Sequence, residues 1–180
     1  ADCLDLPPFR YEDRQCQLTD EQLSMFNMMR SQMQMEATTG NITAVNAADK
    51  ISKLRQVLCG AVKNPATDEY VTIPHGPRLE VLKECIEQAA AKVIVIVPFK
   101  GIINALAKEL SGEYSVAVLN GDVPPRRRDE IVRAFKETPD PHVLLCHPKV
   151  TSHGLNLTEA DVTVFYAPIY SNDEFQQVIE

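Results

Sequence analysis

Four short apolar runs, in which polar residues do not alternate with apolar ones, dominate the second half of this chain. They cover Val93–Val97, Ser115–Leu119, Val143–Cys146 and Val162–Tyr166. Segments with helical spacing of apolar residues separate them, at about 78–89, 102–110 and 126–136. A strand that is apolar at nearly every position is buried on both faces, which is typical of a parallel sheet. The alternation therefore predicts an α/β fold, with a parallel sheet flanked by helices.

The first 75 residues lack this alternation. Thr19 and Gln22 have the spacing of a capping box and predict a helix start. The apolar residues that follow recur near helical spacing and predict one apolar face: Leu23, Phe26, Met29 and Met33. A second helix is expected around Ala47–Gly60, followed by an irregular link with a short strand at Tyr70–Ile73. We therefore divide the chain into an N-terminal segment with a helical hairpin, residues 1–75, and an α/β domain, residues 76–180.

Composition limits the classes of function. The net charge of −7 argues against a protein that coats nucleic acid by bulk electrostatics, but it leaves local phosphate contacts open. No apolar run approaches the roughly 20 residues that span a bilayer, so we expect neither a signal peptide nor a membrane partner. The five cysteines show no C-x-x-C pair, which indicates reduced thiols and a cytoplasmic location.

The loop after the third apolar run is the first candidate for a site. It contains Lys149, Thr151, Ser152, Gly154 and Asn156. Open α/β sheets bind ligands beyond the carboxyl ends of their strands, and a glycine lets the backbone approach a ligand closely. The pattern favours phosphate chemistry. A plain turn, in which asparagine tolerates a left-handed conformation, is the alternative.

Two other kinds of site are weighed against this one. His142, Cys146, His147 and His153 are close in sequence, but their spacing fits no closed zinc-finger pattern, so we expect no metal. A nucleophilic pair of Cys146 and His147 is weaker still, because neighbouring residues on a strand point to opposite faces.

Five sequence patterns occur in the order of one known family. They are the opening segment Leu6-Pro7-Pro8 with Thr19-Asp20-Glu21-Gln22 and Lys53-Leu54-Arg55-Gln56-Val57; Val93–Phe99; Asn120-Gly121-Asp122 with Arg128 and Phe135; His153–Thr158; and Glu174-Phe175-Gln176-Gln177. The chain thereby resembles the C-terminal RecA-like lobe of Swi/Snf-type superfamily 2 helicases and translocases. His147-Pro148 is closer to phage and compact bacterial members, which implies the cytoplasm of a bacterial or phage-infected cell. Val150–His153 departs from the family, which usually has two glycines and a small residue there.

The resemblance implies a DNA-dependent ATPase in which ATP and Mg²⁺ are bound mainly by a separate N-terminal lobe. The residues that match ATP-binding positions are Gly154, Asn156 and Gln177, with Asn156 facing the ribose. The residues that match nucleic-acid-binding positions are Lys100, Arg128, Lys149, Thr151 and Ser152. Bracing of its own loop is an equal alternative for Arg128.

The resemblance also implies that important parts lie elsewhere. The arginines of motif VI would follow Glu180, and the chain has no G-x4-G-K-[ST] phosphate loop. We therefore expect a part of a longer polypeptide, which hydrolyses ATP as a whole while this part alone is inactive. A nucleotide- or protein-binding α/β module without motor activity is the main alternative, and a free-standing flavodoxin-like enzyme is a further one.

Overall fold

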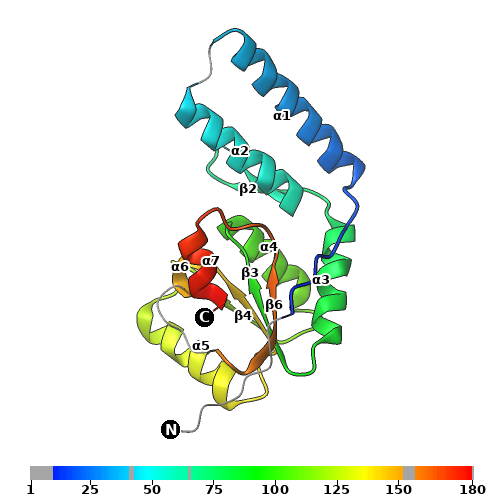
Figure 1. Cartoon of the computed structure of the whole chain (residues 1–180). Coiled ribbons are helices and arrows are strands. Elements are labelled where there is room, and N and C mark those ends of the chain that lie inside the picture. The colour runs from blue at the N-terminus through cyan, green and yellow to red at the C-terminus, as the bar shows by residue number, and fades with distance from the viewer. Residues whose placement is uncertain (1–9, 41–42, 65, 152–156, 180) are drawn as a thin grey trace.

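A helical hairpin stands on an α/β lobe in the computed structural model (Figure 1), which describes residues 10–40, 43–64, 66–151 and 157–179. The elements are α1 (Asp20–Thr38), α2 (Ala44–Cys59), β1 (Ala61–Lys63), β2 (Tyr70–Thr72), α3 (Gly76–Gln88), β3 (Lys92–Ile96), α4 (Lys100–Leu110), β4 (Val116–Leu119), α5 (Pro125–Glu137), β5 (Val143–Cys146), α6 (Pro148–Thr151), β6 (Ala160–Phe165) and α7 (Asn172–Ile179). The four predicted strands are all present. The division of the chain between residues 75 and 76 stays a prediction, although α3 begins at that point.

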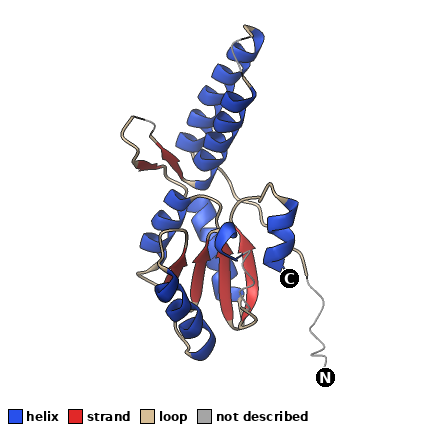
Figure 2. Cartoon of the chain, turned by 90° about the vertical axis from the view of Figure 1, so that its left-hand side faces the viewer, coloured by secondary structure: helices blue, strands red, loops and turns tan. Residues whose placement is uncertain are grey.

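The lobe is built on a four-stranded parallel sheet with the order β4-β5-β3-β6. Helices cover both faces, as Figure 2 shows. The side chains of α3 and α4 pack on one face, and those of α5, α6 and α7 pack on the other. In the described sheet, β3 is the first strand in sequence order, and it lies between β5 and β6, which are the third and the fourth. A flavodoxin-like sheet places its first strand between the second and the third, so this topology rules out the flavodoxin-like alternative.

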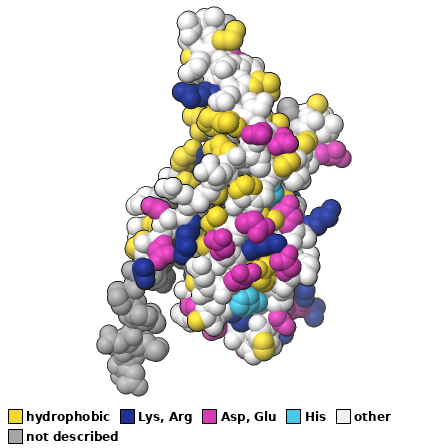
Figure 3. Space-filling view, turned by 90° about the vertical axis from the view of Figure 1, so that its right-hand side faces the viewer, with side chains coloured by type: hydrophobic (Ala, Val, Ile, Leu, Met, Phe, Trp, Pro, Cys, Tyr) yellow, Lys and Arg dark blue, Asp and Glu magenta, His cyan; other side chains and the backbone are white. Residues whose placement is uncertain are grey.

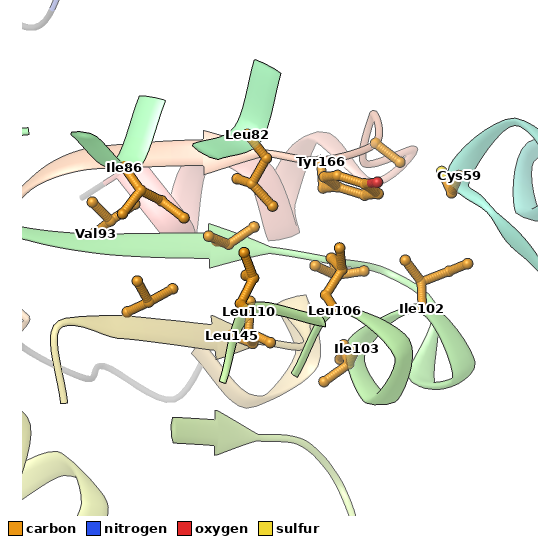
Figure 4. Close-up of a cluster of buried hydrophobic side chains, with 14 of the residues drawn as sticks. Cys59, Leu82, Ile86, Val93, Ile102, Ile103, Leu106, Leu110, Leu145 and Tyr166 are labelled. Carbon is orange, nitrogen blue, oxygen red and sulfur yellow. The ribbon is translucent and has the colours of Figure 1, made fainter. Parts of the chain in front are cut away.

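The apolar runs of β3 and β5 form the centre of the lobe because both of their faces are covered. The expectation of burial on both faces is wrong for β6, which lies at the edge of the sheet and alternates half-buried and exposed residues over 160–163. Val93 and Val95 of β3 point toward α3 and α4 and contact a cluster that includes Leu82, Ile86 and Leu106 (Figure 4). Ile94 and Ile96 point the other way, into a second cluster with Phe135 of α5. The two clusters explain why β3 and β5 show no polar alternation.

Gln22 joins the two helices of the hairpin at its base. The predicted capping box is confirmed, since Gln22 N–H donates to Thr19 Oγ1 over 3.2 Å and Gln22 Oε1 accepts from Thr19 N–H over 3.1 Å. The side chain is 1% exposed, and its Nε2 donates to Val57 O and Leu58 O at 3.0 Å each. These two carbonyls lie in the last turn of α2, where the regular hydrogen bonding of the helix ends. Val57 O also accepts from Gly60 N–H over 3.2 Å. One amide group therefore stabilises the start of α1 and the end of α2.

The apolar face predicted for α1 is wrong at Leu23. That side chain is 47% exposed, because the neighbouring Gln22 occupies the buried position. Phe26, Met29 and Met33 lie half-buried along the same helix. The Gln22 amide donates to carbonyls at the end of α2, which a leucine side chain could not do.

A two-stranded antiparallel ribbon, β1 with β2, connects the hairpin to the lobe. The sequence predicted β2 but not β1. The ribbon begins at Gly60, which ends α2 with a φ of 102° and lies so close to His75 that a Cβ would meet its Nδ1 at 2.2 Å. A Cβ on Gly101 of α4 would likewise meet the ring of Tyr70 at 2.0 Å. The ribbon is therefore seated on α4 by a contact that only glycine permits.

No described helix is both long enough and apolar enough to cross a membrane.

Candidate functional site

The carboxyl ends of the four parallel strands meet at one edge of the sheet, and hydrogen bonds join the segments that follow them. Val97 N–H donates to Cys146 O over 2.8 Å, and His147 N–H donates to Leu119 O over 2.9 Å. Tyr166 N–H donates to Ile96 O over 3.0 Å. The sheet thus continues for one residue beyond its strands, and it holds the loops of the predicted site in fixed relative positions.

Lys100 is the first residue of α4 and comes directly after the β3 segment. Its exposed side chain forms an ion pair with Asp122, in the loop after β4. That loop is held by Asn120, which is 5% exposed and whose Oδ1 accepts from Asp122 N–H over 3.0 Å. To bind a phosphate as predicted, Lys100 must therefore break its ion pair with Asp122 or contact the phosphate and the Asp122 carboxylate at the same time. The Asn-Gly-Asp sequence signals the turn, but it does not reveal the ion pair.

Arg128 lies half-buried at the start of α5. Its Nη2 donates to Val123 O over 3.5 Å, which is a long and weak contact. Its Nε has no hydrogen-bond partner within the described residues although it is buried. This position agrees with the bracing role, and the contact with nucleic acid stays a prediction.

The loop after β5 is described only in part. A one-turn helix, α6, occupies the place where the sequence suggested a polar loop. Lys149 is exposed on it, and its N–H donates to His147 Nδ1 over 3.3 Å. Thr151 is the last residue of α6. Ser152, Gly154 and Asn156 lie outside the described residues, so their predicted roles stay predictions.

Gln177 is exposed on α7, the last helix described. Two contacts fix this helix against the sheet: the rings of Phe165 and Phe175 lie 5.1 Å apart, and Val178 packs on the second core cluster. The amide of Gln177 is thereby presented to solvent, as a contact to a ligand or a second lobe would require.

Two arginines hold the connection between β6 and α7, and the sequence did not assign a role to either. Arg78 of α3 donates from Nη1 to Tyr166 O over 2.5 Å, and its guanidinium lies 5.2 Å from the centre of the Tyr166 ring. Arg55 of α2 donates to Pro168 O and stacks on Tyr170. Arg55 belongs to the Leu-Arg-Gln segment that carried part of the family resemblance. That segment was the only sequence signal for Arg55, since Pro168 and Tyr170 lie more than a hundred residues away.

The two rival sites receive no support from the described geometry. Burial raises the pKa of the Cys146 thiol far above its ordinary value, so the sulfur stays protonated and is a poor nucleophile. Within the ranges that the structure describes, no three His, Cys, Asp or Glu side chains gather as metal ligands would. His153, one of the four candidate ligands, lies outside those ranges.

Comparison with known proteins identifies the chain. A model of the family "Helicase conserved C-terminal domain" matches residues 77–180, which is more than half of the sequence. The chain belongs to this family.

Relatives in the family are much longer than this chain. The TATA-binding protein-associated factor BTAF1 of Arabidopsis thaliana is 29% identical over 140 residues, covering 65% of this chain and 7% of the relative. An uncharacterized ATP-dependent helicase of Mycoplasma genitalium is 25% identical over 165 residues, covering 90% of this chain and 16% of the relative. This chain therefore spans only a small part of the curated proteins that it matches.

Solved structures agree on the fold. The C-terminal domain of the Sulfolobus solfataricus SWI2/SNF2 ATPase matches with a TM-score of 0.58 and 19% identity, covering 84% of this chain and 68% of that domain. The ATPase core of that protein in complex with double-stranded DNA matches with a TM-score of 0.67 and 18% identity, covering 84% of this chain and 33% of the core. The predicted fold, the α/β fold of a helicase C-terminal lobe with N-terminal helices, is confirmed.

Proposed function

We propose that this helicase C-terminal domain is the C-terminal motor lobe of a DNA-dependent ATPase. In this function it supplies half of an ATP site between two lobes and part of the track for nucleic acid. One observation carries the proposal. The four strands of a Swi/Snf-type lobe end at a single edge, where Lys100, Lys149 and the helix of Gln177 are brought together.

The distribution of charge favours this edge over the α3 side of the lobe for nucleic acid. Figure 3 looks onto the side of α3 and shows acidic side chains gathered on the lobe. On α3 itself, Glu80, Glu84 and Glu87 are exposed. A polyanion is repelled from such a face. The cations at the carboxyl edge are free of this repulsion, and their contacts with phosphates would position the chain without reading sequence.

The residues present fit one side of a nucleotide site and lack the parts that hold the phosphates. Gln177 is exposed at the edge and has both a donor and an acceptor for a ligand. Gly154 and Asn156 complete the proposed set. Within the described ranges there is no glycine-rich phosphate loop and no acidic cluster of the kind that holds Mg²⁺. ATP would supply the phosphoryl group, and this lobe would position it against a second lobe of the same polypeptide.

DNA-stimulated ATP hydrolysis tests the proposal directly. We expect the 180-residue chain to be inactive and the full-length gene product to turn over ATP when DNA is added. Asn156→Ala and Gln177→Ala should each lower kcat/KM of the full-length protein by about 3- to 10-fold, because each removes a hydrogen bond to the nucleotide or the closing lobe.

Two exposed residues away from the edge serve as matched controls, Asn27→Ala and Gln34→Ala, both on α1. They should leave the rate unchanged. A full-length protein that folds but shows no DNA-dependent turnover would contradict the motor function and favour a binding module.

The ion pair of Lys100 with Asp122 predicts opposite effects of two substitutions on DNA affinity. Lys100→Ala should weaken binding and reduce the slope of log K against log salt by about 1, because one phosphate contact is lost. Asp122→Asn should strengthen binding by about 2- to 5-fold, because it frees Lys100 and removes a negative charge. Fluorescence anisotropy of labelled duplex at several salt concentrations measures both effects.

Each substitution has a control on the same element or its neighbour. Lys108→Ala removes an exposed lysine at the other end of α4, and Asp129→Asn removes an exposed carboxylate on α5. If Lys100→Ala and Lys108→Ala weaken binding equally, the carboxyl edge is not the track.

A further inference from the structure

Arg55 connects three elements that are distant in sequence. Its guanidinium carbon lies 3.9 Å from the ring centre of Tyr170 and 5.2 Å from the ring centre of Phe99. Its Nη2 also donates to Pro168 O. The side chain therefore contacts two aromatic rings and holds a backbone carbonyl, which is a combination that suits the planar guanidinium better than an ammonium.

Both aromatic partners belong to segments of the candidate site. Phe99 comes directly before Lys100, at the start of α4. Tyr170 comes two residues before α7, the helix that presents Gln177. Its ring is 71% exposed, so the contact with Arg55 covers one side of an otherwise open aromatic group. The orientation of the segment that enters α7 thus depends on a residue of the hairpin.

The hairpin can hold Arg55 in place because hydrogen bonds fix its base. Gln22 joins the start of α1 to the end of α2, and Arg55 lies in the last turns of α2, close to those bonds. Thr19 Oγ1 donates to Pro74 O over 2.8 Å, which ties the same base to the start of α3. The base thus holds α1, α2 and the start of α3 together (Figure 1), and Arg55 belongs to it through α2.

Arg78 holds the beginning of the same connection from within the lobe. It contacts Tyr166, and it belongs to α3 rather than to the hairpin. Removing Arg55 would leave the end of β6 anchored. The effect of that removal should be confined to residues 168–179.

We propose that Arg55 is a positioning residue that couples the α1–α2 hairpin to α7 and Gln177. The hairpin then contributes to the orientation of the site and is not an independent appendage. Any partner that displaces the hairpin would change the position of α7 through this one side chain. The consequence for ATP turnover rests on the proposed function, whereas the coupling itself does not require nucleotide.

Amide hydrogen exchange of the 180-residue chain tests the coupling without ATP or DNA. In Arg55→Ala, exchange in residues 172–179 should be about 5- to 10-fold faster, as expected for the loss of a stacked cation and its hydrogen bond. Exchange in β3 and β5 should stay at the wild-type rate. Tyr170→Leu should give the same pattern, and the double variant should add little, because the two residues act as a pair.

Two further variants separate positioning from simple stability. Arg55→Lys keeps the charge and should restore part of the protection of α7. Lys53→Ala removes a cation on the same helix whose ion pair is with Asp49 of that helix, and it should change nothing in α7. The proposal would be overturned if α7 of Arg55→Ala exchanged at the wild-type rate. It would also be overturned if exchange became faster by the same factor in every element.

ATP hydrolysis by the full-length protein gives an independent measurement. Arg55→Ala should lower kcat several-fold with little change in KM for ATP, because the nucleotide is held mainly by the other lobe, and Arg55→Lys should recover part of kcat. A rise in KM with unchanged kcat would overturn the positioning role. If the wild-type protein shows no turnover, the proposed function fails, and hydrogen exchange alone decides the coupling.

Discussion

Phe135→Ala is expected to lower the free energy of unfolding by about 3–5 kcal/mol, the largest effect of any single substitution considered for this chain. The Phe135 ring is 0% exposed and lies in the second core cluster, between α5 and the sheet. Lys92 Nζ lies 4.7 Å from its centre, so a cation–ring contact is lost together with the apolar packing. Urea denaturation followed by circular dichroism measures the loss.

Two comparisons make this result specific. Phe135→Leu should cost less than half as much, because it keeps most of the buried volume. Val45→Ala, at a side chain that is 78% exposed, should be nearly neutral. A loss below about 1 kcal/mol for Phe135→Ala would mean that α5 does not pack on the sheet as described.

Gln22→Glu is expected to destabilise the hairpin by about 2–4 kcal/mol although the two side chains have nearly the same shape. The amide nitrogen now donates to Val57 O and Leu58 O, and a carboxylate would place negative charge against both carbonyls. The site is buried, so water cannot relieve the repulsion. Hydrogen exchange in α1 and α2, together with urea denaturation, measures the change.

The pH dependence of this variant offers an internal control. The loss should shrink as the pH falls, because a protonated carboxyl group can donate to one of the two carbonyls. Gln34→Glu makes the same chemical change at an exposed position of α1 and should alter stability by less than about 0.5 kcal/mol. Equal effects at positions 22 and 34 would contradict the buried hydrogen bonds.

The strands of the lobe were predictable because their physical cause is local in the sequence. A run such as Val143–Cys146 is apolar throughout, since it is covered on both faces, and Val93–Ile96 of β3 has the same pattern. The capping box at Thr19 was predictable for the same reason, because its two partners are three residues apart. The β1 strand was not, since three residues show no period and their conformation depends on pairing with β2.

The order of the motifs predicted which residues belong to the candidate site, but it did not predict the contacts that these residues make. Lys100 and Asp122 are 22 residues apart and meet only because β3 and β4 end at the same edge of the sheet. Arg55 is separated from Pro168 by 113 residues, and no local pattern links them. The exposure of Leu23 was not predictable for the same reason. The carbonyls at the end of α2 accept from the Gln22 amide, so residue 22 rather than residue 23 takes the buried position of α1.

The position of Gln22 has a consequence for how such hairpins vary in length. At the base Gln22 joins α1 to α2 and Thr19 joins the hairpin to Pro74, whereas the ion pair of Glu36 with Lys50 lies nearer the far end. Antiparallel helices can be lengthened or shortened together, and seven residues in each arm correspond to about two turns, or roughly 10 Å. Paired insertions at the far end would leave every contact of the base in place. The reach of the hairpin can therefore change between related proteins while the lobe and its sheet edge remain the same.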